Sequence, residues 1–100
     1  MKSEKLIWLI YDICSNKKRS KISKACIDMG LYRVQKSVFL GKLNINRLDE
    51  LAMICEELMD EDSDSVYIFP LCDEDYKKVK LLGQAFDKEL VSDEVLEQFF

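Results

Sequence analysis

One short segment constrains the fold more than any other part of the chain, because it is apolar on both of its sides. Residues 5–12 read KLIWLIYD, and this mixture of β-branched, aromatic and aliphatic side chains is typical of a strand. Alternation along the strand puts Leu6, Trp8, Ile10 and Asp12 on one face and Ile7, Leu9 and Tyr11 on the other. A strand with two apolar faces must be covered from both sides.

The rest of the chain predicts a regular succession of helices and strands. A helix begins near Ser15 or Asn16 and ends at Gly30, two strands or one bent strand occupy 31–35 and 37–43, and a second helix spans 46–60. An acidic turn at 60–64 leads to a strand at 65–71, and residues 76–82 form a short additional strand. This β-α-β-β-α-β order predicts an α+β, ferredoxin-like domain over residues 1–83, followed by a C-terminal tail over 84–100.

Helical spacing predicts that each helix turns an apolar stripe toward the sheet. The first stripe contains Ile22, Ala25, Cys26 and Met29, and the second contains Leu48, Leu51, Ala52, Cys55, Leu58 and Met59. The four cysteines form no CxxC pair and the chain has no His, which disfavours zinc and favours free thiols. Free thiols suit a reducing cytosol, and the apolar run at 6–11 is too short to span a membrane. We therefore expect a cytoplasmic protein without a membrane contact.

The arrangement of two helices on one sheet face leaves the other face of the sheet without a cover. The first strand is apolar on that side too, so the face needs a partner. A second copy of the same sheet, related by a two-fold axis, is the simplest cover. We therefore expect a homodimer formed through the sheet faces.

Charge is distributed very unevenly along the chain, whose net charge is −4. Residues 1–47 carry a net charge of +8 and residues 48–100 a net charge of −12. Much of the positive charge lies on the first helix, at Lys17, Lys18, Arg19, Lys21 and Lys24. Cations near a helix N-terminus are disfavoured by the macrodipole, and a bound phosphate reverses that penalty. The cluster predicts a polyanion-binding surface, and the alternative is a solvated helix face without a ligand.

Four further polar positions are candidates for a site. Asp12 is a lone carboxylate at the end of an apolar strand, where it either binds a metal or caps the turn into the first helix. Arg33 and Gln35 alternate onto one face of their strand, and Arg33 suits either a phosphate contact or an ion pair with the acidic half. Ser37 either donates to a phosphate or satisfies the bend between the strands.

Several of these segments together resemble a known family. YDI at 11–13 is followed by KKRSKI at 17–22, GLYRVQKSVFLGKL at 30–43 and SVYIFPLC at 65–72. In this order and at this spacing, the segments resemble the CRISPR-associated "Cas-two" family over residues 5–83. The resemblance implies a ferredoxin-like homodimer that binds double-stranded DNA and bridges subunits of the CRISPR integrase during spacer acquisition.

The resemblance also implies a site. It assigns a catalytic and metal-binding role to Asp12, with Mg²⁺ or Mn²⁺, in an endonuclease acting on RNA or DNA, although other members of the family are scaffolds. With one carboxylate per chain, a two-fold axis beside Asp12 would supply the second. Together with the charge argument, the candidate nucleic-acid-binding residues are Lys17, Lys18, Arg19, Lys21, Lys24, Arg33, Gln35 and Ser37.

Two questions stay open from the sequence. One alternative function is a ferredoxin-like RNA-binding or regulatory module without nuclease activity, although KSVFLGKL lacks the stacking aromatics of RNA-recognition modules. The tail either docks the integrase or packs on its own dimer, because an apolar chain end of this kind usually marks a contact. Its candidate partner-binding residues are Leu90, Val91, Val95, Leu96, Phe99 and Phe100.

Overall fold

The protein is described by a computed structural model over residues 4–72, 74–75, 78–80 and 82. Its elements follow the predicted order β1 (Lys5–Asp12), α1 (Asn16–Asp28), β2 (Tyr32–Gln35), β3 (Val38–Leu43), α2 (Ile45–Leu58) and β4 (Ser65–Leu71). The four strands form one sheet in the order β2-β3-β1-β4, and every neighbouring pair is antiparallel. This is the ferredoxin-like topology, in which the two outer strands are the second and the fourth strand of the chain.

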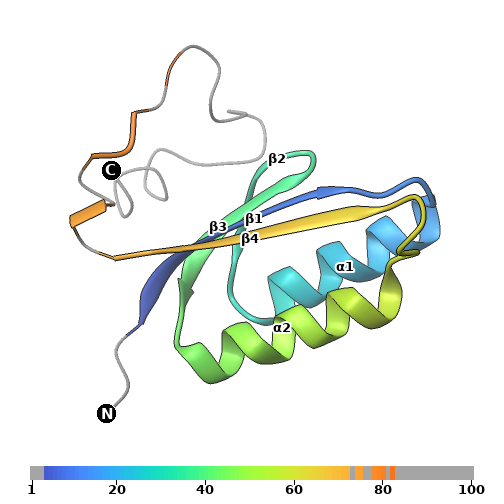
Figure 1. Cartoon of the computed structure of the whole chain (residues 1–100), viewed down its shortest axis with the longest axis horizontal. Coiled ribbons are helices and arrows are strands. Elements are labelled where there is room, and N and C mark those ends of the chain that lie inside the picture. Colours follow the sequence, from blue (N-terminus) through green and yellow to red (C-terminus); the bar gives the residue numbers. More distant parts are fainter. Residues whose placement is uncertain (1–3, 73, 76–77, 81, 83–100) are drawn as a thin grey trace.

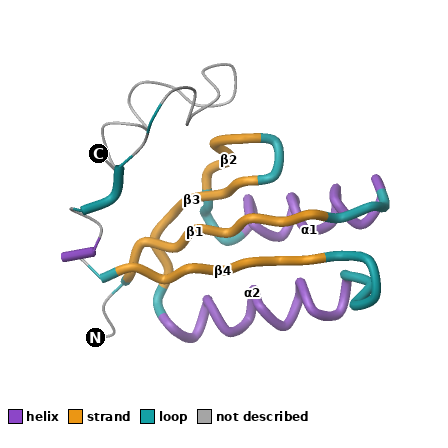
Figure 2. The backbone as a smooth tube through the Cα atoms, turned by 45° about the horizontal axis from the view of Figure 1, so that its top comes forward, coloured by secondary structure: helices purple, strands orange, loops and turns teal. Residues whose placement is uncertain are grey.

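Both helices lie on the same side of the sheet, next to each other (Figure 1). In the turned view of Figure 2, α1 overlaps β1 and α2 lies below β4. The sheet therefore has one face covered by helices, called here the covered face, and an opposite face, called here the open face.

Capping residues and two glycines determine where the helices begin and end and how closely β3 approaches the chain after α1. The Ser15 hydroxyl accepts a hydrogen bond from the Lys18 amide at the start of α1, and the Asn44 side chain accepts one from the Arg47 amide at the start of α2. Gly30 follows the end of α1 with a φ of 90°, a backbone conformation that favours glycine. A Cβ at Gly41 would lie 3.0 Å from the Leu31 Cα, so β3 needs a glycine there to approach the chain after α1.

The covered face holds the main core. Ile7, Leu9 and Tyr11 of β1 pack there with Phe39 of β3, and the helices contribute Ile22, Cys26, Leu51 and Cys55. Cys26 and Cys55 are buried free thiols, as predicted. Burial raises the pKa of Cys26 to about 12, helped by the nearby Cys55 thiol, and raises the pKa of Cys55 to about 11.

The open face holds a smaller cluster. Leu6, Val34 and Leu40 are buried there, and Trp8, Val38 and Leu71 pack against them. Beside this cluster, the β4 side chains Tyr67 and Phe69 are 53% and 49% exposed. Their rings stack with centroids 6.4 Å apart. The open face is therefore apolar but only partly shielded from water.

Parts of the sequence prediction need correction or lie outside this description. Ala52 is exposed rather than part of the buried stripe of α2. Residues 78–80 and 82 form no strand, while 76, 77 and 81 of the additional strand predicted at 76–82 lie outside the described residues. The tail at 84–100, with all six of its candidate partner-binding residues, also lies outside them. No helix in the described ranges is long and apolar enough to cross a membrane.

Candidate nucleic-acid and metal site

A polar pocket of about 510 Å³ lies between α1 and the hairpin formed by β2 and β3. Three of its lining side chains are cations, namely Arg19, Arg33 and Lys36. The other lining residues contribute hydroxyl or amide groups: Tyr11, Asn16, Ser20, Ser23 and Ser37. No carboxylate lines the pocket, so its chemistry suits an anion with several oxygen atoms, such as a phosphate.

The hairpin turn is held in place by donors that converge on one carbonyl. The Lys36 carbonyl accepts hydrogen bonds from the Tyr11 hydroxyl at 3.0 Å, from Arg33 Nε at 3.1 Å and from Arg33 Nη2 at 2.7 Å. The Arg33 guanidinium also lies 5.9 Å from the centre of the Phe39 ring. Arg33 is thus fixed at the pocket wall, and it forms no ion pair within the described residues.

The predicted basic cluster of α1 divides between two faces of the helix. Arg19 turns toward the pocket, where its Nη1 also donates to the Ile13 carbonyl at 3.2 Å. Lys17, Lys21 and Lys24 follow at helical spacing on a separate, exposed stripe. Lys24 forms an exposed ion pair with Asp28 at 2.8 Å, and that hydrogen bond raises the pKa of Lys24. Backbone hydrogen bonds from Asp60 and Cys14 lower the pKa of Asp64, and the charge of the half-buried Lys18 adds to this effect.

The side chains beyond α1 only partly follow the predicted site. Ser37 lines the pocket as expected, and its carbonyl accepts a hydrogen bond from the Tyr11 amide at 3.0 Å. The pairing of β2 with β3 shifts between Arg33 and Gln35, so Gln35 lies opposite Val38. This irregularity interrupts the expected alternation, and Gln35 is not among the residues that line the pocket.

Asp12 ends β1 and lies opposite Ser65 at the start of β4. Its neighbour Tyr11 is buried on the covered face, so alternation turns Asp12 toward the open face, where the structure leaves it exposed. The alternative role of Asp12 as a turn cap is not observed: within the described residues its carboxylate accepts no hydrogen bond, and Ser15 caps α1 instead. Asp12 therefore lies directly after a pocket residue but on the other side of the sheet.

One described chain does not supply a complete metal site. Among the residues that the structure describes, no group of three or more His, Cys, Asp or Glu side chains could hold a metal ion. Mg²⁺ in nucleic-acid enzymes usually takes one or two carboxylates and completes its shell with water and phosphate oxygens. The exposed Asp12 carboxylate would supply one such ligand, and Asp12 of another copy of the chain would supply a second.

A buried carboxylate near Asp12 was not predicted as a functional residue. Asp64 is 7% exposed and accepts hydrogen bonds from the Cys14 amide at 3.0 Å and the Asp60 amide at 2.9 Å. These two amides lower the pKa of Asp64. The sequence indicated only an acidic turn at 60–64, because the partner Cys14 is 50 residues away along the chain. In the sequence, the only indication of a special role for Asp64 was its position directly before a predicted strand.

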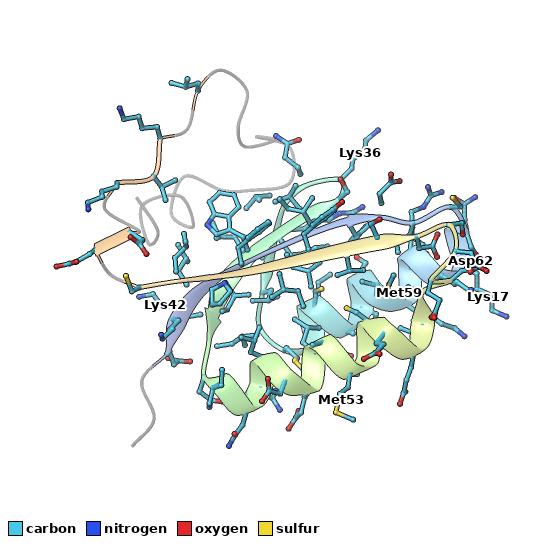
Figure 3. All side chains as sticks on the ribbon, viewed as in Figure 1. Lys17, Lys36, Lys42, Met53, Met59 and Asp62 are labelled. Carbon is cyan, nitrogen blue, oxygen red and sulfur yellow. The ribbon has the colours of Figure 1, made fainter. Side chains whose placement is uncertain are left out.

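The outer surface of the helix layer has two oppositely charged halves. α1 exposes Lys17, Lys21 and Lys24, whereas α2 exposes Asp49, Glu50, Glu56 and Glu57. Figure 3 shows Lys17 and Lys42 toward opposite ends of the molecule, and Met53 projecting from α2 away from the sheet. The charge asymmetry of the sequence thus persists on the folded surface, although Arg47 of α2 and Lys5 of β1 are exposed cations outside α1 and the hairpin.

The fold and the site together define a ferredoxin-like α+β domain that combines a cationic pocket with an exposed carboxylate at a strand end. Residues 5–79 match the family model described as "CRISPR associated protein Cas2". The chain belongs to this family, as the resemblance of its motifs implied.

Relatives and solved structures agree with this assignment. The chain is 31% identical to the "CRISPR-associated endoribonuclease Cas2" of Korarchaeum cryptofilum over 78% of its own length and 84% of that protein. It is 38% identical to the protein of the same description from Desulforudis audaxviator, over 72% of this chain and 68% of that one.

Among solved structures, Streptococcus pyogenes Cas2 at pH 6.5 superposes with a TM-score of 0.64 at 25% identity, covering 78% of this chain and 99% of that one. A hypothetical protein from Thermus thermophilus, TT1823, superposes with a TM-score of 0.66 at 29% identity, covering 80% of this chain and 92% of that one. The likeness therefore extends over most of the described fold.

Proposed function

We propose that this chain is a CRISPR adaptation component that binds double-stranded DNA as a homodimer, bridges integrase subunits, and hydrolyses phosphodiester bonds with a metal held at Asp12. The observation that supports the nuclease part is the exposed carboxylate of Asp12, which lies at the end of β1 on the open face, where a second copy of the chain would meet it. The relatives described as endoribonucleases make RNA the first cleavage substrate to test, with DNA as the second.

The pocket provides a place for the nucleic-acid backbone. Arg19 and Arg33 are each anchored by a backbone carbonyl, so their remaining N–H groups are held in position before a phosphate arrives. Lys36 and the exposed lysines of α1 extend the positive surface beyond the pocket. Contacts of this kind read the charge of the backbone and not the base sequence, so binding should be strongly dependent on salt.

The proposed metal is Mg²⁺, or Mn²⁺ in its place, held by Asp12 of two copies together with water and the substrate phosphate. When bound, the metal would activate water and stabilise negative charge on the phosphodiester. Asp12 is suited to this role because its carboxylate is exposed and, within the described residues, makes no hydrogen bond that metal binding would break.

The second copy is proposed to cover the open face. That face carries a small apolar cluster next to the exposed Tyr67 and Phe69, and alternation places Asp12 on the same side. Burying these aromatics against a two-fold-related sheet would remove them from water and bring the two Asp12 side chains toward the same axis. The dimer would thus complete both the core and the metal site.

Bridging of integrase subunits rests on membership of the family and on the acidic surface of α2, which offers a contact for a basic protein. The proposed contacts of the tail lie outside the described residues. A cytoplasmic location is part of the proposal, because all four cysteines are free thiols.

An RNA-binding module without catalysis is the second candidate, favoured by the exposed, stacked pair of Tyr67 and Phe69 on the open face. RNA-recognition modules place such rings on central strands, where bases stack on them. Here the pair lies on the outer strand β4, and Trp8, the aromatic residue of the central strand β1 on this face, is partly buried against the apolar cluster. The position of the pair therefore favours a protein contact.

The test is a cleavage assay with labelled RNA and DNA, comparing Mg²⁺ and Mn²⁺ with a chelator. We expect metal-dependent cleavage by the wild type and its loss in Asp12→Asn, which keeps the shape of the side chain but removes its charge. Asp49→Asn is the matched control, because Asp49 is an exposed carboxylate on α2. Wild-type activity in an Asp12→Asn variant that remains dimeric would refute the catalytic role.

A further inference from the structure

Asp64 is the only charged side chain buried within the described residues. A buried carboxylate is costly unless hydrogen bonds replace its hydration. Here Oδ1 accepts from the Cys14 amide and from the Ser63 hydroxyl at 3.3 Å, while Oδ2 accepts from the Asp60 amide. Both oxygens are therefore in use, and one of their donors belongs to the loop that follows Asp12.

The register of the strands shows why this contact matters. The ladder between β1 and β4 ends at the pair of Asp12 and Ser65. The chain before Ser65 turns away there, because the Asp64 amide donates to the Asp60 carbonyl at 2.8 Å. Beyond the last pair, the Asp64 carboxylate takes the place of a backbone acceptor and binds the Cys14 amide. The Asp64 side chain thus continues the hydrogen bonding between the two chain segments beyond Asp12, the residue that would hold the proposed metal.

The loop between β1 and α1 has other anchors: two side-chain hydrogen bonds join it to α1, and the Cys14 thiol donates a weak hydrogen bond to the Ser63 carbonyl at 3.7 Å. Arg19 donates to the Ile13 carbonyl, and the Lys18 amide donates to the Ser15 hydroxyl. These bonds join the loop to the helix that follows it. Asp64 is different, because it joins the loop to β4, the strand that pairs with Asp12. Asp64 and the weaker Cys14 thiol bond therefore join the loop to the turn before β4, and the charged Asp64 carboxylate supplies the stronger of the two contacts.

We propose that Asp64 is a positioning residue, which holds the loop after β1 against β4 and so aims the Asp12 carboxylate at its partner across the dimer axis. This inference rests on the proposed function of Asp12. It does not require Asp64 to touch metal or substrate. A carboxylate that must meet a second carboxylate around one ion is sensitive to small displacements of its backbone.

Asp64→Asn tests the inference, because the amide keeps one oxygen acceptor but places an NH₂ group against one of two backbone donors. We expect kcat for metal-dependent cleavage to fall by roughly 10- to 100-fold with KM nearly unchanged, the range typical for residues that support a metal ligand. The metal concentration needed for half-maximal activity should rise as well. Asp62→Asn is the matched control, since Asp62 is an exposed carboxylate of the same turn (Figure 3).

Amide hydrogen exchange at Cys14 provides a readout that does not depend on cleavage. We expect faster exchange of this amide in Asp64→Asn than in the wild type or Asp62→Asn, while amides in the centre of β1 keep their protection. Unchanged exchange at Cys14 would overturn the inference, as would a lower melting temperature with unchanged kcat in the folded variant. A wild type that cleaves nothing would overturn the nuclease proposal, whereas the exchange result would still decide whether Asp64 holds the loop.

Discussion

The two faces of the sheet differ in how completely the chain covers them. On the covered face, Leu9 and Phe39 are fully buried beneath two helices. On the open face, a cluster of three buried residues lies beside aromatic side chains that are about half exposed. Because β1 is apolar on both sides, this difference indicates that the covered face stabilises the protomer and that the open face is available for assembly.

The largest expected effect is on the free energy of unfolding, which substitutions on the two faces should lower by different amounts. Leu9→Ala should lower the free energy of unfolding by about 2–5 kcal/mol, because it leaves a cavity in a fully buried site. Phe69→Ala should cost less at low protein concentration, and its effect should grow with concentration because a second copy stabilises the folded state by mass action. Urea titrations at two protein concentrations measure both effects. If Phe69→Ala lowered the free energy of unfolding as much as Leu9→Ala, and equally at both protein concentrations, Phe69 would belong to the core of the protomer.

The second prediction concerns assembly through the open face. Tyr67→Asp should raise the dissociation constant of the homodimer by roughly 30-fold or more without unfolding the protomer, because buried aromatic anchors contribute at least about 2 kcal/mol to association. Sedimentation equilibrium measures this constant. Met53→Asp is the matched control, since Met53 is 62% exposed on the outer side of α2 (Figure 3). A dimer weakened by Met53→Asp and not by Tyr67→Asp would place the interface on the helix layer.

The third and smallest effect distinguishes the pocket from the open face in DNA binding. Lys36→Ala should weaken duplex binding equally for all sequences and reduce the slope of log affinity against log salt by about 0.9. Lys42→Ala should leave the slope unchanged, because Lys42 is an exposed lysine on β3 that does not line the pocket. Fluorescence anisotropy over a range of salt concentrations gives both slopes. If only Lys42→Ala changed the slope, the DNA-binding surface would lie outside the pocket.

Much of the fold follows from local patterns in the sequence. The apolar alternation of residues 5–12, the Ser15 cap and Gly30 are short-range signals, and the structure places β1 and α1 accordingly. Ala52 was assigned to the wrong face because its position lies at the border of the helical stripe and its small side chain gives little preference for burial. The homodimer was expected from the same alternation and stays a prediction.

The site was harder to predict, because it depends on contacts between distant segments. Arg19, Arg33 and Ser37 were named from charge and spacing, and all three line one pocket. Lys36 and the α1 serines were missed, since nothing in their local sequence shows that the hairpin folds toward α1. Gln35 does not line the pocket, because a register shift that simple alternation does not reveal interrupts β2 there, and its proposed role stays a prediction. The proposed roles of Lys17, Lys18, Lys21 and Lys24 stay predictions, as does that of Asp12.

The central claim is that the open face brings two Asp12 carboxylates to one metal-dependent site. The most direct test mixes wild-type and Asp12→Asn subunits in varying ratio, allows them to exchange, and measures cleavage. If both carboxylates are required, only dimers of two wild-type subunits are active, and activity falls as the square of the wild-type fraction. A linear fall would show that each Asp12 acts alone, and would contradict the shared site.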